Sequence, residues 1–306
     1  MAVESLPLAG ARLRAGAALR TAALVWREAR PVVQIMFVLR FLAGAALAAG
    51  NSVLSVRTLA GLVTWSAAVC AVYLRNGVAD VVEDRRNGST RPVAAGRLDA
   101  GRALTIARSL AAGSIVASAL LDPRAGLLAA AMVALGWAYS AGRRPLKGSV
   151  AGFALIVIGG GLLTYLAGAL LAHGRWSAPA FCFGLVMSLW MATAGSSKDL
   201  SDVEGDRAAG RRSLPVLLGP SLAAAVIAGA TLALAAGFVA VAVLLAPALR
   251  LCAAVLATGA AVTAVALLGT PPAAGRARRR RAYRAFMATQ YATHLGLFVN
   301  IAASVI

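Results

Sequence analysis

Acidic residues are scarce in this chain. Of its 306 residues, 11 are Asp or Glu and 30 are Lys or Arg, and charged residues together make up 13% of the total. Soluble domains contain about 25% charged residues. Hydrophobic residues make up 60% of the chain, and its mean hydropathy is +0.80. This composition excludes the ordinary soluble class and, with its long apolar runs, predicts an all-α membrane protein.

Cysteine and histidine are also rare, with three and two copies. Cys70, Cys182 and Cys252 all lie within apolar runs, and no two of them have the CxxC spacing. The odd number and the missing motif argue against a disulfide framework or a zinc site. We expect buried thiols that pack as small hydrophobic groups.

The net charge of +19 raises the question of a nucleic-acid partner. The basic residues do not form one continuous face, however, because they lie in the short gaps between apolar runs. Membrane topology accounts for this distribution, since Lys and Arg are retained on the cytoplasmic side. We therefore expect contact with membrane lipid and no nucleic-acid partner.

Nine apolar runs approach the length of about 20 residues that a bilayer core requires. They lie at residues 32–50, 54–74, 103–121, 125–141, 150–171, 178–197, 221–246, 251–269 and 283–304. The gaps on the N-terminal side hold 24 of the 30 Lys and Arg residues, and the opposite gaps hold one each. This alternation predicts nine transmembrane helices in the cell membrane, with the N-terminus in the cytoplasm and the C-terminus outside.

Residues 1–31 precede the first run and contain five Arg residues among Ala and Leu. They are predicted to form a basic amphipathic segment on the membrane surface. A disordered basic tail is the alternative for the first ten residues. Residues 32–306 are expected to form a single nine-helix domain.

The pattern Asp-Val-x-x-Asp-Arg-x-x-Gly occurs twice, at residues 80–88 and 202–210. These two copies contain six of the eleven acidic residues. Four predicted spans separate the copies, so both are expected on the cytoplasmic side. The repeat indicates an ancient duplication in which two motifs face each other across a helical bundle.

Two sets of oxygen-bearing side chains with helical spacing surround the copies: Asn76, Asp80 and Asp84 in the first, and Asp199, Asp202 and Asp206 in the second. A continuous helix would carry each set on one face. Neither set contains His or Cys, and hard oxygen ligands suit Mg²⁺ that is shared with substrate phosphates. Ion pairs at the membrane interface are the alternative interpretation.

Basic residues accompany both sets. Arg91 follows the first copy, Arg143 and Lys147 follow the fourth run, and Lys198 precedes the second copy. Cations beside a metal-binding face suit a substrate with several phosphate oxygens, although singly they are also typical anchors of membrane topology. Arg40 lies inside the first run, where it either points into an interior cavity and helps bind substrate or extends to the interface.

These motifs resemble those of the UbiA superfamily of intramembrane prenyltransferases, and the resemblance covers nearly the whole chain. Residues 76–98 are similar to the first signature and its following loop, and residues 198–215 are similar to the second. The wording is closest to the branch of homogentisate and related quinone-type enzymes. Two departures stand out: Arg143 replaces the Lys of a Tyr-x-x-x-Lys element that begins at Tyr139, and Gly77 follows Asn76 where the family often has Asp.

The resemblance implies nine helices around a central cavity, with Mg²⁺-bound prenyl diphosphate at the cytoplasmic mouth. One Mg²⁺ would be held by Asn76, Asp80 and Asp84, and the other by Asp202 and Asp206 with support from Asp199. The diphosphate would contact Arg143, Lys147 and Lys198, with Arg91 and Arg40 as further candidates. Tyr139 would shield an allylic cation, and ordinary packing is the alternative role for this ring.

The predicted function is Mg²⁺-dependent transfer of a prenyl group from a prenyl diphosphate to a hydrophobic aromatic acceptor, phenolic or quinone-precursor, within the membrane. Transfer to a lipid or sugar-phosphate acceptor and cyclisation of the prenyl diphosphate are alternatives within the same fold. A cation-coupled transporter is an alternative from another class. Transporters usually carry such carboxylates near the middle of the membrane, whereas these are expected at helix ends.

Overall fold

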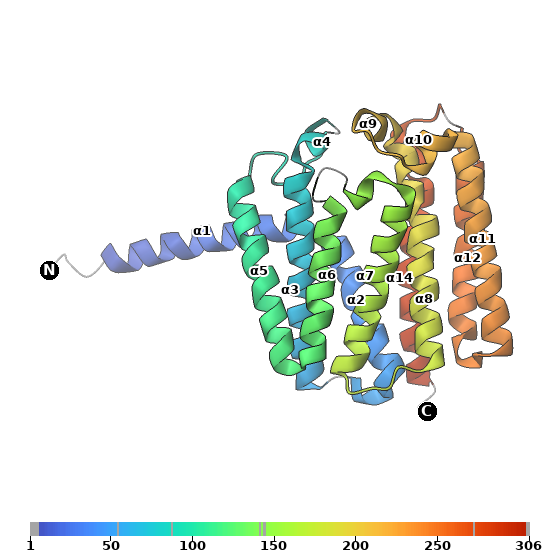
Figure 1. Ribbon diagram of the computed structural model, residues 1–306, viewed down its shortest axis with the longest axis horizontal. Coiled ribbons are helices and arrows are strands. Elements are labelled where there is room, and N and C mark those ends of the chain that lie inside the picture. Colours follow the sequence, from blue (N-terminus) through green and yellow to red (C-terminus); the bar gives the residue numbers. More distant parts are fainter. Residues whose placement is uncertain are drawn as a thin grey trace.

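The computed structural model describes residues 6–53, 55–86, 88–140, 142, 145–271 and 273–303, and these fold into a helical bundle (Figure 1). The long helices of the bundle run roughly parallel to one another and are α2 (Pro31–Ala49), α3 (Val56–Ala79), α5 (Ala100–Leu121), α6 (Pro123–Ser140), α7 (Val150–Leu171), α8 (Ala178–Thr193), α11 (Pro220–Leu244), α12 (Arg250–Leu268) and α14 (Arg281–Ala303). Each predicted apolar run overlaps one of them, which confirms the all-α prediction.

Seven helical segments in the described part of the chain are long and apolar enough to cross a membrane. α6 and α14 are also helices at predicted positions, but they do not meet this criterion. Polar residues dilute their apolar content: Arg124 lies in the first turn of α6, and α14 carries Arg281, Arg284, Gln290 and His294. The multi-pass membrane class is supported by the seven segments, and the number nine stays a prediction.

Side-chain caps define several helix starts. The hydroxyls of Ser55, Ser149 and Ser177 accept hydrogen bonds from backbone N–H groups in the first turns of α3, α7 and α8. The carboxylate of Asp99 does the same for α5. Such caps satisfy N–H groups that have no partner within the helix.

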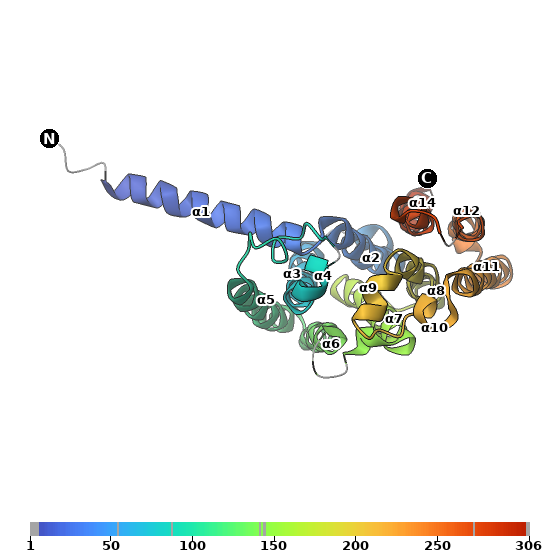
Figure 2. The same cartoon turned by 90° about the horizontal axis from the view of Figure 1, so that it is seen from above.

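Helix α1 (Leu6–Glu28) projects away from the bundle, and its far end stands alone in both views (Figures 1 and 2). Its end, by contrast, contacts the bundle, because Glu28 and the following Ala29 are both fully buried. Arg30 turns the chain sharply with a left-handed φ of 59°, and Pro31 then begins α2. The surface position predicted for residues 1–31 stays a prediction for the projecting part.

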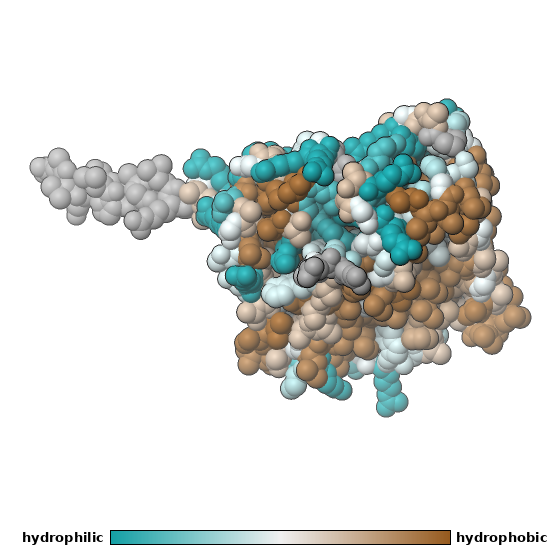
Figure 3. All heavy atoms as spheres, turned by 45° about the horizontal axis from the view of Figure 1, so that its top comes forward, coloured by the Kyte–Doolittle hydropathy of each residue, from teal (hydrophilic) through white to brown (hydrophobic). Residues whose placement is uncertain are grey.

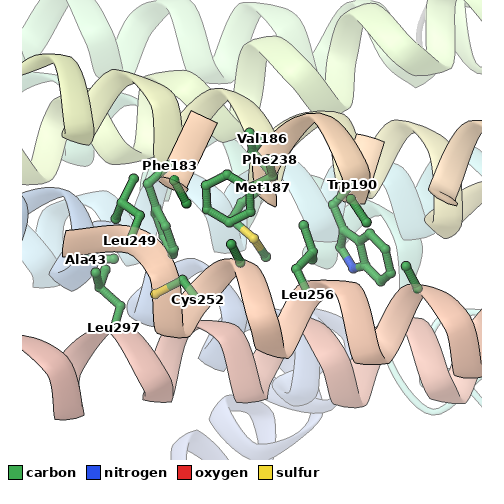
Figure 4. Packing of buried hydrophobic residues seen from close by; sticks show 14 of the residues in the cluster. Ala43, Phe183, Val186, Met187, Trp190, Phe238, Leu249, Cys252, Leu256 and Leu297 are labelled. Carbon is green, nitrogen blue, oxygen red and sulfur yellow. The ribbon is translucent and has the colours of Figure 1, made fainter. Parts of the chain in front are cut away.

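The core consists of side chains between the long helices. Figure 4 shows Phe183, Trp190, Phe238 and Leu256 interdigitating between α8, α11 and α12, and Cys252 packs among them as a small hydrophobic group. The prediction of buried thiols is confirmed for Cys252, whereas Cys70 and Cys182 are half-buried. Helices α2 and α7 approach more closely than side chains would allow. A Cβ on Gly44 would overlap the Tyr165 carbonyl oxygen, and a Cβ on Gly168 would overlap the Phe41 carbonyl oxygen. Small residues permit this approach in membrane bundles.

Short helices gather at one end of the bundle, which is here called the motif end: α4 (Val81–Arg86), η3 (Ala194–Ser201), α9 (Val203–Ala208), α10 (Leu214–Leu218) and α13 (Arg276–Arg279). The 3₁₀ turn η2 (Leu146–Gly148) contacts α6 and α7. Hydrophilic side chains are concentrated at the motif end, and hydrophobic ones cover the flank of the bundle (Figure 3). Both acidic repeats lie here, so the prediction that they share one side is confirmed at the level of the fold.

Candidate active site

The first acidic set lies where α3 ends and α4 begins. Asp80 caps α3 with φ −93° and ψ 3°, so the expected continuous helix is interrupted at its centre. The three side chains accordingly have different partners. Asn76 Nδ2 donates to Ser140 Oγ at 2.8 Å, Asp80 pairs with Lys147, and Asp84 pairs with Arg91. The set is held at the motif end, but it is not a single stripe that faces one ligand.

The second acidic set is interrupted in a similar way. Residues up to Ser201 form the 3₁₀ helix η3, Asp202 ends it with φ −123°, and α9 carries Asp206. The Ser201 hydroxyl donates to the Lys198 carbonyl at 2.8 Å and to Asp202 Oδ1 at 3.1 Å. Local bonds of this kind compete with α-helical hydrogen bonding, which is why the predicted i, i+3, i+7 face does not form as one α-helix.

One guanidinium connects the two motifs. Arg211 Nη2 lies 2.6 Å from Glu83 Oε2 in the first motif, and its Nη1 lies 3.4 Å from Asp206 Oδ1 in the second. Lys147 Nζ pairs with Asp80 and lies 3.9 Å from Glu83 Oε2. These five residues are here called the carboxylate cluster. They bring together side chains from the α3–α4 junction, α4, η2, α9 and the loop after α9.

A backbone contact brings the two cations of the cluster together. The Arg212 N–H donates to the Gly148 carbonyl at 2.9 Å, and Ser149 and Arg212 form an isolated parallel bridge. The loop that follows α6 is thereby attached to the loop that follows α9. Lys147 and Arg211 are adjacent to this bridge in sequence, which is why both reach the acidic motifs.

The carboxylate cluster has more acids than cations. Asp80, Glu83 and Asp206 share Lys147 and Arg211, and the carboxylate of Asp206 is almost fully buried, with a further hydrogen bond of 2.9 Å from Ser213 Oγ. Burial raises the pKa of Glu83 above its ordinary value, Arg211 partly offsets this, and Asp80 adds to the rise. Carboxylates crowded in this way favour the binding of an additional cation.

Asp84 belongs to a separate ion-pair chain. Arg91 Nη1 lies 2.9 Å from Asp84 Oδ2, and Arg91 Nη2 lies 2.8 Å from Glu28 Oε1. The Arg91 side chain is only 9% exposed, so both carboxylates hold it firmly in place. Arg91, which was predicted to contact diphosphate, therefore pairs with two carboxylates and has little contact with solvent.

Asp202 belongs to a third set of ion pairs, in which three cations surround one carboxylate. Its carboxylate lies 3.5 Å from Lys198 Nζ, 2.9 Å from Arg276 Nη2 and 3.7 Å from Arg280 Nη2. Although burial opposes ionisation, these three cations together hold the pKa of Asp202 below its ordinary value. Asp199 differs, because among the described residues its carboxylate has no ion-pair partner within 4.0 Å.

The predicted metal ligands are close together but not assembled. Within the described ranges, no three His, Cys, Asp or Glu side chains form a ready metal site. The donor chemistry nevertheless fits Mg²⁺, since Asp80, Glu83 and Asp206 offer hard carboxylate oxygens. Lys147 and Arg211 now neutralise these oxygens, so a metal ion would bind as these cations move to other negative groups.

The remaining predicted residues have diverse surroundings. Tyr139 lies half-buried near the end of α6, and Arg143 falls outside the described residues. Arg40 is buried inside the bundle, 3% exposed, where its Nη2 donates to Gln290 Oε1 at 2.9 Å and its guanidinium lies 5.4 Å from the Phe37 ring centre. Within the described part of the chain, the buried Arg40 Nε atom has no hydrogen-bond partner. Of the two predicted orientations, Arg40 therefore has the inward one and does not extend to the membrane interface.

Three further residues were not predicted as part of the site: Glu28, Glu83 and Arg211. Glu83 lies within the first repeat, three residues after Asp80, and this helical spacing could have pointed to it. Arg211 follows the second repeat directly. Glu28 is distant in sequence from both motifs. The scarcity of acidic residues was an available signal, since each buried carboxylate in so basic a chain calls for a specific partner.

The sequence profile of the UbiA prenyltransferase family matches residues 37–290 of this chain. Among curated relatives, a digeranylgeranylglyceryl phosphate synthase from Natronomonas pharaonis is 29% identical over 59% of this chain and 63% of its own length. The enzyme of the same name from Methanoculleus marisnigri is 32% identical over 47% of this chain and 50% of its own length. The chain therefore matches less than two thirds of either relative.

Solved structures share the fold. A UbiA homologue from Archaeoglobus fulgidus, bound to GPP and Mg²⁺, superposes with a TM-score of 0.67 at 18% identity and covers 91% of this chain and 99% of that one. A structure of digeranylgeranylglyceryl phosphate synthase gives a TM-score of 0.68 at 17% identity and covers 92% of this chain and 98% of that one. The family profile spans most of the chain, and the chain belongs to the UbiA prenyltransferase family.

Proposed function

We propose that this protein transfers a prenyl group from a prenyl diphosphate to a phosphate-bearing glycerolipid, with Mg²⁺ as cofactor. The observation that carries the proposal is the double contact of Arg211 with Glu83 and Asp206. This contact brings the two acidic motifs together, and a metal-bound diphosphate would need carboxylates from both motifs. The structure of the Archaeoglobus fulgidus homologue with GPP and Mg²⁺ supports the choice of donor and metal.

The roles proposed for the residues follow from their contacts. Asp80, Glu83 and Asp206 are the carboxylates closest to the point where the motifs meet and would hold the metal, with Asn76 and Asp202 nearby and Asp84 and Asp199 in support. Bound Mg²⁺ would neutralise the charge that develops on the leaving diphosphate. Lys147 and Arg211 would exchange their carboxylate partners for phosphate oxygens, and Lys198 and Arg143 are further candidates for this contact. Arg91 would keep its two carboxylate partners.

The reaction breaks the bond between the prenyl carbon and the diphosphate oxygen, and the electron pair stays with the diphosphate. A glycerol hydroxyl oxygen forms the new ether bond to that carbon, and its proton passes to the released diphosphate. Tyr139, near the end of α6, would face the allylic cation with its ring. The apolar bundle would keep water from reaching the cation before the acceptor does.

Arg40 supports an anionic acceptor. A buried guanidinium is costly unless paired, and among the described residues Arg40 has no carboxylate within 4.0 Å. Its unpartnered Nε suits a phosphate group on a lipid headgroup. The digeranylgeranylglyceryl phosphate synthases among the relatives also favour this acceptor over the aromatic one that the motif wording suggested. Arg40 is therefore assigned to the acceptor phosphate instead of to the diphosphate.

The topology belongs to the same proposal. Nine spans, counting α6 and α14, would put the motif end and the N-terminus on the cytoplasmic side and the C-terminus outside. The concentration of Lys and Arg in gaps on one side supports this orientation.

The test uses the purified full-length protein in lipid nanodiscs with Mg²⁺. Geranyl, farnesyl and geranylgeranyl diphosphates are offered with a prenylglyceryl phosphate or with a hydroxybenzoate, and diphosphate release and products are measured. We expect release with the glycerol phosphate, strongly slowed release by Asp80→Asn, and normal release by Asp122→Asn at the other end of the bundle. Arg40→Met is expected to raise KM for the acceptor and not for the diphosphate.

No diphosphate release with any acceptor would overturn the proposal. Prenylation of the hydroxybenzoate alone would keep the donor site and reject the glycerolipid acceptor. An unchanged acceptor KM in Arg40→Met would reject the role of Arg40 while leaving the reaction in place.

A further inference from the structure

Helix α1 contributes a carboxylate to the surroundings of the first acidic motif. We propose that Glu28, in the last turn of α1, is a positioning residue that fixes Asp84 through Arg91 and so completes this motif. The inference rests on the proposed function for its metal and diphosphate readouts. It gives a role to a helix that otherwise projects away from the bundle (Figures 1 and 2).

The burial of Glu28 is the first observation. Its side chain is fully buried, although it belongs to a chain with only eleven acidic residues. Removing a carboxylate from water costs several kcal/mol unless partners compensate. Oε2 accepts a hydrogen bond of 2.9 Å from the Val93 N–H, and Oε1 forms an ion pair with Arg91 Nη2 at 2.8 Å, although within the described residues Oε1 has no hydrogen-bond partner. Such a group is placed with a specific geometry.

The second observation is that Arg91 passes this geometry on to the motif. Its Nη1 donates to Asp84 Oδ2 at 2.9 Å, while its Nη2 also donates to the carbonyl oxygens of Glu28 and Tyr73, both at 3.2 Å. The guanidinium is therefore held by α1 and by α3. The position of the Asp84 carboxylate depends on this arrangement, because Arg91 is the cation paired with it in the described structure.

The third observation concerns Gly77, next to Asn76 in α3. A Cβ on this residue would overlap Glu28 Oε1 and would lie 2.6 Å from Arg91 Nη2. The carboxylate of Glu28 thus occupies the space that a side chain on residue 77 would enter. The family resemblance led us to expect an Asp often at this position. In this chain, a carboxylate from another helix fills the same place and pairs with Arg91.

The reciprocal relation between Glu28 and Gly77 gives a sharp test. In Glu28→Ala, Arg91 loses one carboxylate and Asp84 loses its fixed partner. In Gly77→Asp, two carboxylates compete for one space. The double variant Glu28→Ala/Gly77→Asp removes the clash and returns a carboxylate to Arg91, whose flexible end can adjust. We expect both single variants to be impaired and the double variant to recover most of the loss.

The readouts separate positioning from folding. Mn²⁺ binding is measured by electron paramagnetic resonance on the full-length protein in nanodiscs with geranylgeranyl diphosphate, together with thermal unfolding and the split between kcat and KM. Glu28→Gln keeps the shape of the side chain, so it is the mildest variant. We expect it to weaken Mn²⁺ binding roughly 10-fold, as is typical when a residue that orients a metal ligand is changed.

The matched control is Glu204→Gln. The Glu204 side chain is 74% exposed, and its Oε1 forms a surface ion pair with Arg279 Nη1 at 3.6 Å. This variant is expected to bind Mn²⁺ as the unaltered protein does. If Glu28→Gln unfolds earlier but binds Mn²⁺ and turns over normally per folded molecule, Glu28 is structural only and the inference is wrong. Failure of the double variant to exceed both single variants also overturns it. An inactive unaltered protein would instead reject the proposed function.

Discussion

At the end of the bundle opposite the acidic motifs, Asp122 Oδ2 lies 2.9 Å from Arg57 Nη2 and 3.0 Å from Arg124 Nη2. Two cations therefore pair with one carboxylate. Hydrogen bonds from Arg124, with help from Arg57 and against the effect of burial, lower the pKa of Asp122 to about 2. The charge of the Asp122 carboxylate is therefore satisfied by the protein itself.

The carboxylate cluster at the motif end has the opposite balance. Three carboxylates share Lys147 and Arg211, and burial raises the pKa of Glu83 where partners lower that of Asp122. Among the described residues, two cations therefore face three acids in this group. On the proposed function, the ion pairs at the motif end exchange partners when a charged ligand binds, and those at the opposite end hold the fold.

The largest expected effect comes from breaking the link between the motifs. Arg211→Met removes the cation shared by Glu83 and Asp206 and leaves a half-buried and a buried acid without it. We expect kcat/KM for the prenyl diphosphate to fall about 100-fold to 1,000-fold, the range found when one preorganised charge-stabilising group is removed. Steady-state release of diphosphate measures it.

The neighbouring Arg212 provides the control for this variant. Its side chain is exposed, and its structural bond is made by the backbone N–H, which Arg212→Met retains. Arg212→Met should therefore stay close to full activity. Equal losses in the two variants would mean that the contacts of Arg211 with both motifs carry no special weight.

An intermediate effect, on stability alone, is expected at the opposite end. Asp122→Asn should lower the free energy of unfolding by roughly 1 kcal/mol, as partly exposed ion pairs contribute little, and should leave turnover unchanged. Because the folded-state pKa of Asp122 is depressed to about 2, its contribution is present above pH 4 and lost as the pH falls toward 2.

Thermal unfolding in detergent at pH 6 and at pH 3 measures this effect. The difference in melting temperature between Asp122→Asn and the unaltered protein should narrow at the lower pH. A difference that widens on acidification, or a large loss of turnover, would contradict the structural role assigned to this end.

The smallest effect is expected at the rim of the motif end. Arg276 contacts Asp202 with a side chain that is 50% exposed. Arg276→Gln should change KM for the prenyl diphosphate about fivefold or less, the range of exposed ion pairs, with kcat unchanged. Arg278→Gln, which alters an exposed residue on the same short helix, is the control in the same kinetic assay and should have no effect. A larger loss of kcat would place Arg276 in the catalytic step.

The sequence was sufficient for the helices because the length and apolarity of a run are local properties. Because four predicted spans separate the two repeats, the sequence also predicted that both lie at one end. Spacing alone failed inside the repeats, since Asp80 and Asp202 interrupt their helices and direct neighbouring acids to different cations. The contacts of Arg211 and of Glu28 depend on tertiary packing between distant segments, which no periodicity records.

The central claim is that the two acidic motifs serve one ligand, and a double-mutant cycle tests it most directly. Asp80→Asn, Asp206→Asn and their combination are compared by single-turnover release of diphosphate, with the folded fraction of each variant checked. Residues that act as a unit are strongly non-additive, so we predict that the double variant is scarcely slower than the worse single variant. Losses that multiply in full would show that the two carboxylates act on independent sites.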